Sequence, residues 1–295
     1  MLYDEILTYA GVYRQGCEEL SAAGIDEAQT DARLLLEWCC GTDRNTLLAH
    51  GDRLVTSEEY SHYADCIEKR KAHIPLQYIT GEQEFMGLTI TVNENVLIPR
   101  LDTEVLVEEV MRYLHDGMRI LDMCTGSGCI LLSLLRYSND CTGAGVDLSG
   151  DALQVARENT VRILGEQAIE QARVELFQSD LFDALEEPNA GNKYDIIVSN
   201  PPYIKTDDIN SLMPEVKEHE PHMALDGRKD GLFYYRKIIT CACRYLTGGG
   251  MLFLEIGYDQ GEEVRRMMED AGYTDIEVVK DYAGLDRVVF GGSHV

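Results

Sequence analysis

A short stretch of the chain, "SNPPY" at residues 199–203, combines residue types that can bind a planar amino group. Because proline lacks a backbone N–H and has a restricted φ angle, the two prolines end the preceding run "YDIIV" and hold the chain rigid. Asn200 offers a side-chain carbonyl oxygen, and Pro201 offers a main-chain carbonyl oxygen of fixed direction. Together these oxygens can accept both N–H bonds of one –NH₂ group, while Tyr203 stacks on the flat group that carries it. We expect Asn200, Pro201, Pro202 and Tyr203 to bind a substrate, with a purely structural strand stop as the alternative.

This arrangement suits transfer of a group to an amide or aromatic amine, whose nitrogen is a weak nucleophile because its lone pair is delocalised. Two acceptors that pull on the N–H bonds favour a more tetrahedral nitrogen, and this gain is larger in the transition state than in the ground state. The reaction then depends on proximity and orientation and needs no strong general base. The pattern predicts Asn200, Pro201 and Tyr203 as catalytic residues.

A glycine-rich segment, "LDMCTGSGCI", lies between a predicted strand and a predicted helix. Its turn, Cys124-Thr125-Gly126-Ser127-Gly128, would direct backbone N–H groups and a helix N-terminus at a ligand. Asp147 ends the next predicted strand, where an acid that binds ribose hydroxyls belongs, and Asp180 follows the third strand in "FQSDLF". Because ligands bind outside the carboxyl ends of parallel strands, we expect these residues to form one crevice.

The ligand of this crevice is expected to contain adenosine, and a dinucleotide and S-adenosylmethionine both remain open at this point. The turn lacks the third glycine of the dinucleotide pattern, and Asp122 adds negative charge nearby. A sulfonium cation suits that charge better than a pyrophosphate does. The G-x-G turn by itself would also fit a nicotinamide oxidoreductase.

Periodicity along the chain predicts an α/β protein. Helical patterns occupy the first 75 residues, with a capping box at Thr56-x-x-Glu59, and a β-hairpin with its turn at residues 93–95 follows. From a helix capped at Asp102 onward, strands and helices alternate and end in a terminal hairpin, which predicts a mostly parallel sheet covered on both faces. We expect an N-terminal helical substrate-recognition domain at 1–74, a hairpin linker at 75–101 and a nucleotide-binding-type domain at 102–295.

Composition restricts the classes of partner. The 295 residues carry a formal net charge of −26, which disfavours binding to bare nucleic acid. The chain lacks a secretory leader pattern and a stretch apolar enough to span a membrane, so we expect a soluble, cytoplasmic protein without a membrane partner. Nine cysteines without a C-x-x-C pair predict neither a disulfide framework nor a metal site.

These motifs, together with "PLQYITGEQEF" and "LIPRLDTEVLVE", resemble the HemK/PrmC family of peptide-chain release factor N5-glutamine methyltransferases over nearly the whole chain. The resemblance implies a class I methyltransferase fold, S-adenosylmethionine as cofactor, and the glutamine of the Gly-Gly-Gln motif of release factors as substrate. It implies the following site residues. The cofactor would be held by Cys124, Thr125, Gly126, Ser127, Gly128 and Asn200, its ribose by Asp147 and its adenine by Asp180 and Leu181; the glutamine would be bound by Asn200, Pro201, Pro202 and Tyr203, with Arg100 and Phe85 near the entrance.

The chain departs from the family pattern at two positions. Cys124 stands where glycine is common, so we expect a negative φ there, and Leu181 stands where an aromatic residue is common. Neither change removes a donor or acceptor, so altered cofactor affinity is expected rather than loss of activity. Two other functions use the same motifs, an N6-adenine nucleic-acid methyltransferase that acts on a flipped base and a non-catalytic binding module.

Overall fold

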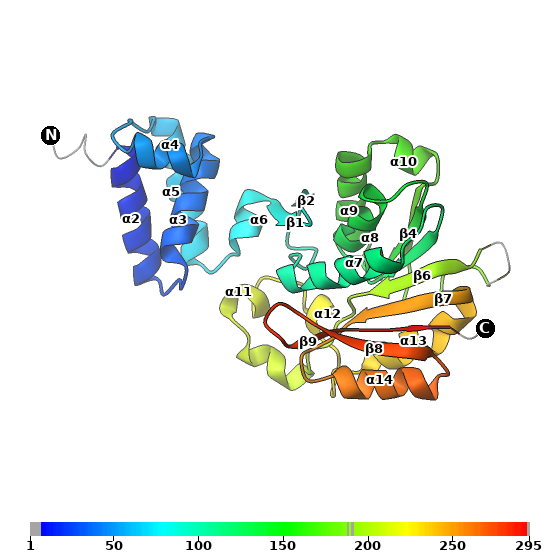
Figure 1. Ribbon diagram of the computed structural model, residues 1–295. Coiled ribbons are helices and arrows are strands. Elements are labelled where there is room, and N and C mark those ends of the chain that lie inside the picture. Colours follow the sequence, from blue (N-terminus) through cyan, green and yellow to red (C-terminus); the bar gives the residue numbers. More distant parts are fainter. Residues whose placement is uncertain (1–6, 188, 190–191, 294–295) are drawn as a thin grey trace. The chain divides into compact units, whose positions relative to one another are not determined.

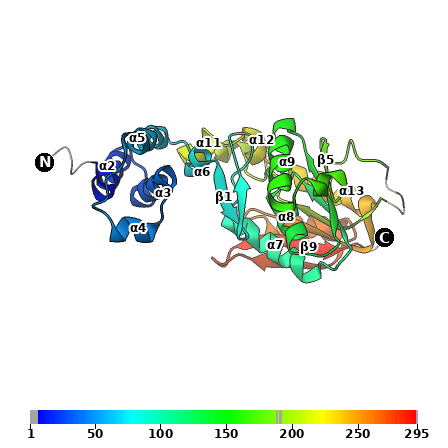
Figure 2. The ribbon, with the colours of Figure 1, turned by 90° about the horizontal axis from the view of Figure 1, so that it is seen from above.

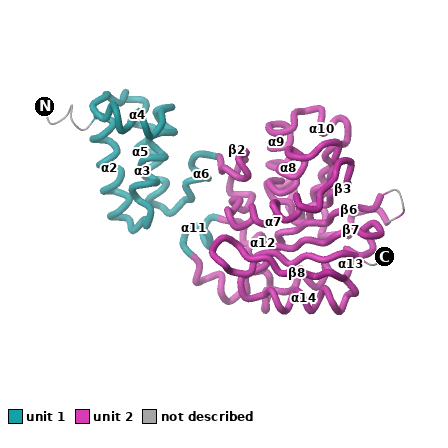
Figure 3. The backbone as a smooth tube through the Cα atoms, viewed as in Figure 1, with its two compact units in different colours: residues 1–81, 213–219 teal, residues 82–212, 220–295 magenta. Residues whose placement is uncertain are grey.

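A computed structural model describes residues 7–187, 189 and 192–293. Within these residues the chain forms two compact units, drawn in different colours in Figure 3. The first comprises residues 7–81 and 213–219, and the second comprises residues 82–212 and 220–293. The division into 1–74, 75–101 and 102–295, with its assignment of roles, stays a prediction.

The first unit consists of helices. They are α2 (Tyr9–Ala22), α3 (Ala28–Cys40), α4 (Arg44–Ala49), α5 (Ser57–Lys71), α6 (Leu76–Thr80) and the short α11 (Pro214–Lys217). The predicted capping box at the start of α5 is confirmed, because Thr56 accepts a hydrogen bond from the backbone of Glu59 and the Glu59 side chain accepts one from the backbone of Thr56. Fully buried leucines from α2 and α3 pack with Ile67 of α5 to form the core of this unit.

A buried arginine explains why residues 213–219 join the first unit. Arg70 of α5 donates from Nε to Asp31 Oδ2 of α3 at 2.7 Å and from Nη2 to Glu215 Oε1 of α11 at 2.9 Å. Glu215 also contacts Nδ1 of His73 at 3.0 Å. Asp31 and Glu215 lie 39 and 145 positions from Arg70 in the sequence, so local patterns do not reveal their association.

The second unit begins with the predicted hairpin, β1 (Glu82–Phe85) and β2 (Leu88–Thr91). The expected turn at residues 93–95 is wrong, because the chain reverses at Met86 (φ 51°) and Gly87 (φ 69°) instead. A two-residue turn with two positive φ angles matches the twist of paired strands, whereas Asn93 makes a separate turn by accepting from the backbone of Asn95 at 3.0 Å.

The described residues of the second unit form a seven-stranded sheet in the order β5-β4-β3-β6-β7-β9-β8. β9 is antiparallel to both of its neighbours, and the other adjacent strands are parallel. The strand bounds are β3 (Arg119–Met123), β4 (Thr142–Asp147), β5 (Val174–Gln178), β6 (Tyr194–Ser199), β7 (Leu246–Glu255), β8 (Thr274–Lys280) and β9 (Asp286–Gly292). The predicted mostly parallel sheet with a terminal hairpin is therefore confirmed.

Helices cover both faces of this sheet, as Figures 1 and 2 show. One face carries α7 (Leu101–Tyr113), α8 (Cys129–Arg136) and α9 (Gly150–Leu164), which pack side by side, and the other carries α13 (Phe233–Tyr245) and α14 (Gly261–Asp270). Shorter helices lie in the connections: α10 (Gln167–Glu170), the 3₁₀ helix η1 (Thr206–Ser211) and α12 (His222–Leu225). No helix of the described residues is long and apolar enough to cross a membrane.

The N-cap of α7 lies two residues earlier than expected. The sequence predicted Asp102 as its cap, but the N-cap position is Arg100 and no side chain caps the helix. Asp102 lies in the first turn, where its Oδ2 is 3.2 Å from Nη2 of Arg287 on β9. An acid in the first turn still interacts favourably with the positive end of the helix dipole.

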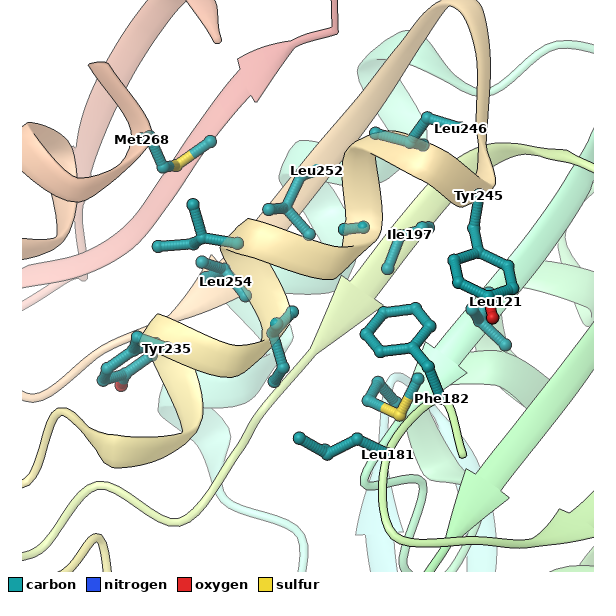
Figure 4. Close-up of a cluster of buried hydrophobic side chains, with 14 of the residues drawn as sticks. Leu121, Leu181, Phe182, Ile197, Tyr235, Tyr245, Leu246, Leu252, Leu254 and Met268 are labelled. Carbon is teal, nitrogen blue, oxygen red and sulfur yellow. The ribbon is translucent and has the colours of Figure 1, made fainter. Parts of the chain in front are cut away.

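One core cluster of the second unit lies between α13 and the sheet, as Figure 4 shows. The rings of Phe182 and Tyr245 stack with centroids 4.8 Å apart. Leu181, one of the predicted cofactor residues, belongs to this cluster and is 7% exposed. The core therefore extends to the carboxyl ends of the strands, where the predicted site residues lie.

Candidate active site

A cavity lies at the carboxyl ends of β3, β4, β5 and β6. Most of the predicted site residues line it: Cys124, Thr125, Gly126, Ser127, Asp147, Asp180, Leu181, Asn200 and Pro202, with Arg100 beside them. Gly128, Pro201, Tyr203 and Phe85 do not line this cavity. The cavity is also lined by residues that the sequence did not indicate, among them Thr103 of α7, and Pro221 and Met223 at the start of α12.

The glycine-rich turn has a conformation that differs from the expectation at its first residue. Cys124 has φ 62°, not a negative φ, because the chain turns sharply where β3 ends. This left-handed conformation costs a non-glycine residue roughly 1–2 kcal/mol. Gly126 has φ 53°, and a Cβ atom built there would meet nothing within 4 Å, so its backbone is open to a ligand.

Gly128 does not line the cavity but lets two helices pack closely. A Cβ atom at this position would lie 3.2 Å from Cδ1 of Leu132 and 3.4 Å from Cβ of Ala156. Its φ is also positive, at 80°. The absence of a side chain at Gly128 therefore allows the start of α8 to approach α9 closely.

Asp147, at the end of β4, connects this strand to the glycine-rich turn and to the start of α9. Its Oδ2 accepts a hydrogen bond from the backbone N–H of Gly126 at 2.9 Å, and its Oδ1 accepts one from the N–H of Ser149 at 2.9 Å. Burial raises the pKa of the Asp147 carboxyl, and the backbone N–H groups of Ser149 and Gly126 oppose that rise. A carboxylate has about four acceptor positions, so both oxygens retain capacity for a ligand.

Asp122 has a different role from the one expected. It is fully buried in β3, does not line the cavity, and its Oδ2 accepts a hydrogen bond from Oγ1 of Thr125 at 2.6 Å. Burial raises the pKa of this carboxyl to about 7, so it carries only part of its charge at neutral pH. Its main contribution is to hold the turn, and Asp147 and Asp180 supply the carboxylates that line the cavity.

The side chain of Asn200 is oriented by α7. Its Nδ2 donates to Oγ1 of Thr103 at 3.3 Å, and Thr103 is 2% exposed. Because the amide nitrogen is engaged in this way, the carbonyl oxygen is the end of the side chain left to accept hydrogen bonds at the cavity. The orientation agrees with the acceptor role that the sequence predicts for Asn200.

Tyr203 anchors the segment instead of lining the cavity. Its hydroxyl donates to Oε1 of Glu255 at 3.3 Å, its side chain packs against the core cluster of Figure 4, and its carbonyl oxygen accepts from Nε2 of Gln260 at 3.1 Å. Burial raises the pKa of the Tyr203 phenol well above its ordinary value. The predicted stacking of this ring on a substrate stays a prediction.

Two glycines pack against the backbone of Tyr203, and sequence reasoning missed both. A Cβ atom on Gly227 would lie 2.7 Å from Cα of Tyr203, and one on Gly231 would overlap the Tyr203 carbonyl oxygen. Gly227 also donates its N–H to the carbonyl of Ile204 at 2.8 Å. The local signal was the pair of glycines in "LDGRKDGL", which gives no indication of what they pack against.

Replacement of Gly231 by alanine is expected to displace Tyr203 and lower kcat at least about tenfold, since small displacements of positioned groups cost this much or more. Gly249→Ala is the matched control, because Gly249 has φ 84°, similar to φ 74° at Gly231, but a Cβ atom there would meet nothing within 4 Å. Both variants place alanine at a positive φ, so a difference in kcat between them measures the effect of the contact between the new Cβ atom and Tyr203. Equal kcat values for the two variants would contradict the supporting role of Gly231.

The buried carboxyl of Glu255, at the end of β7, lies next to the Asn200–Tyr203 segment and accepts a hydrogen bond from the Tyr203 hydroxyl. Burial raises the pKa of Glu255 to about 7, although Thr103 and Arg287 stabilise its charged form. Because this pKa is above the usual value of 4.5, proton binding stabilises the folded chain fully below about pH 4.5, and this contribution is lost as the pH rises through 7.

Glu255→Gln removes this titration. We expect its melting temperature relative to the unsubstituted chain to increase by more than about 2 °C between pH 5 and pH 8, as measured by calorimetry. Glu263→Gln, an exposed change on α14, serves as control and should show no such trend. A pH-independent difference for Glu255→Gln would mean that Glu255 is ionised throughout this range.

The strand order, the helices on both faces and the cavity at the carboxyl edge define the class I methyltransferase fold. A methyltransferase from Pyrococcus furiosus shares this fold, with a TM-score of 0.50 and 16% identity over 80% of this chain and 100% of that chain. Residues 100–217 match the methyltransferase small domain, and residues 12–81 match the PrmC N-terminal domain.

Relatives identify the family. The chain is 41% identical over 272 residues to a release factor glutamine methyltransferase of Geobacter sulfurreducens, covering 92% of each chain. It is 38% identical over 287 residues to a release factor glutamine methyltransferase of Caulobacter vibrioides, covering 97% of this chain and 96% of the relative. The chain belongs to the release factor glutamine methyltransferase family, which confirms the resemblance seen in the sequence.

Proposed function

We propose that this chain transfers a methyl group from S-adenosylmethionine to the side-chain amide nitrogen of the glutamine in the Gly-Gly-Gln motif of peptide chain release factors. The observation that carries the proposal is the placement of Asn200 at the cavity, with its amide nitrogen held by Thr103. The names of the relatives, which describe them as acting on a glutamine of release factors, support the same substrate. The proposed setting is the cytoplasm.

The residues of the cavity fit S-adenosylmethionine. Gly126 leaves its backbone open to a ligand, and the half-buried carboxylate of Asp147 supplies negative charge. The carboxylate of Asp180, which lies 3.6 Å from Nζ of Lys237, also lines the cavity, and Leu181 and Leu148 supply apolar surface for a base. When bound, this cofactor supplies a methyl group on a positively charged sulfur. A cation of this kind suits the carboxylate-lined cavity. We therefore assign cofactor binding to Cys124, Thr125, Gly126 and Ser127 of the turn and to Asp147, Asp180, Leu181 and Asn200, while Gly128 supports the turn through packing.

The chain's own contribution to the chemistry is to hold the glutamine amide. The Asn200 side-chain oxygen and the Pro201 carbonyl oxygen accept its two N–H bonds, which favours a tetrahedral nitrogen with an available lone pair. Pro202 keeps the Pro201 carbonyl in one direction, and Tyr203 fixes the segment through its hydrogen bond to Glu255. Directly after transfer the amide nitrogen carries a positive charge and is strongly acidic, so its surplus proton leaves to water.

Charge supports a protein substrate over nucleic acid. At a net charge of −26 the chain repels a phosphate backbone and attracts a basic protein surface. A release factor domain that works against ribosomal RNA is expected to be such a surface. The same charge argues against the N6-adenine methyltransferase alternative, which needs a basic groove.

Intact-mass spectrometry tests the proposal. A release factor and a duplex DNA are each incubated with the chain and S-adenosylmethionine. We expect one added methyl group on the release factor and none on the DNA. Methylated adenine with an unmodified release factor would replace the proposal by the nucleic-acid alternative, and binding of the cofactor without transfer to either would favour a non-catalytic module.

A further inference from the structure

Two neighbouring helices of the first unit bring together three side chains that can bind a soft metal ion. Cys39 lies near the end of α3, and His62 and Cys66 lie on α5. One ligand atom from each of the three lies within 4.8 Å of the other two. The cluster belongs entirely to the first unit and is separate from the candidate active site.

The geometry within the cluster suits tetrahedral coordination. His62 and Cys66 are four residues apart on α5, so they share one face of the helix. The Sγ atoms of Cys39 and Cys66 are 3.8 Å apart. Two thiolates bound to one Zn²⁺ at about 2.3 Å with a tetrahedral angle are separated by roughly 3.8 Å, so no rearrangement of these two sulfurs is required.

The exposure of the three side chains and the contact of His62 with Trp38 favour binding of a metal ion. Cys66 is 1% exposed, Cys39 is partly buried and His62 is exposed, so an ion can enter from the His62 side. The imidazole of His62 packs against the Trp38 ring with centroids 4.7 Å apart, which limits its motion.

We propose that Cys39, His62 and Cys66 bind one Zn²⁺ ion with two thiolates and one neutral imidazole, and that the open fourth position holds a water molecule. This set of ligands matches the zinc sites that have three protein ligands and one exchangeable position. Binding releases the two thiol protons to solvent and involves no change of oxidation state. The ion links α3 to α5 and so stabilises the unit that matches the PrmC N-terminal domain.

This inference revises the expectation that the chain has no metal site. The ligands are at positions 39, 62 and 66, and this spacing lacks the C-x-x-C signal that zinc sites usually give. The packing of α3 against α5, which sequence patterns do not specify, brings Cys39 to the other two.

Titration of the full-length, reduced and metal-free chain with Co²⁺ tests the proposal, because Co²⁺ bound to thiolates absorbs in the near ultraviolet and tetrahedral Co²⁺ absorbs in the visible. We expect one equivalent to produce both sets of bands and one equivalent of Zn²⁺ to remove them. Cys39→Ser, Cys66→Ser and His62→Ala should each weaken Zn²⁺ binding at least about 100-fold, since even changes beyond the direct ligands cost 10–100-fold.

Cys40→Ser is the matched control, because Cys40 is the neighbour of Cys39 in the chain but lies outside the cluster. It should retain the bands and the Zn²⁺ affinity. His62→Ala guards against unfolding, because His62 is exposed and its loss should leave the helical circular dichroism unchanged. Absence of thiolate bands in the unsubstituted chain, or bands that persist in Cys39→Ser and Cys66→Ser, would overturn the proposal.

Discussion

The variant Asn200→Ala is expected to lose methyl transfer, with kcat at least about 100-fold below that of the unsubstituted chain. This magnitude is typical of the removal of one hydrogen-bonding group that acts mainly in the transition state. The Asn200 amide nitrogen already donates to Thr103, so alanine removes an oriented acceptor and not a mobile side chain. Single-turnover kinetics with a saturating release factor would measure the loss.

Asn210→Ala provides the control for Asn200→Ala, because Asn210 is an exposed asparagine of η1. Its kcat should stay within about twofold of the unsubstituted value, as expected for surface changes away from a site. The affinity of Asn200→Ala for S-adenosylmethionine should fall less than its kcat does. Transfer at a normal rate by Asn200→Ala would remove this residue from the mechanism.

Replacement of Asp147 is expected to have the largest effect on cofactor binding. Asp147→Ala should weaken the affinity for S-adenosylmethionine at least about 100-fold in a calorimetric titration, since hydrogen bonds to a charged group contribute about 1.5–3 kcal/mol each. Part of this effect arises in the protein, because Gly126 and Ser149 lose the acceptor of their N–H groups. The glycine-rich turn would then lose its connection to the start of α9.

Two further variants separate these contributions. Asp151→Ala removes an exposed acid from the first turn of α9 and changes the net charge equally, so its affinity should be near that of the unsubstituted chain. Asp147→Asn keeps one acceptor oxygen and should lie between Asp147→Ala and the unsubstituted chain. Equal affinities for Asp147→Ala and Asp151→Ala would contradict the assignment of Asp147 to the cofactor.

Much of the site could be predicted because its residues lie where strands end. Periodicity located β3, β4, β5 and β6, and polar residues directly after parallel strands meet at one edge of a sheet. This is why Asp147 and Asp180, which are 33 positions apart in the sequence, were expected in one crevice and both line the cavity. Local capping rules likewise predicted the start of α5 correctly.

The features that were missed depend on contacts between distant segments. Gly231 leaves room for the Tyr203 carbonyl oxygen, and Thr103 accepts a hydrogen bond from the Asn200 side-chain amide. No local sequence pattern indicates either contact. Cys124 adopts a positive φ because the strand-to-helix turn requires it, and this requirement overrides the intrinsic preference of a non-glycine residue. Tertiary structure decided each of these positions.

Tandem mass spectrometry of a release factor, after incubation with this chain and S-adenosylmethionine, tests the central claim most directly because it locates the methyl group at a particular atom. The account predicts one methyl group on the side-chain amide nitrogen of the glutamine in the Gly-Gly-Gln peptide, and none when Asn200→Ala replaces the unsubstituted chain. A methyl group on any other residue, or an unmodified glutamine in the presence of a chain that binds the cofactor, would contradict it.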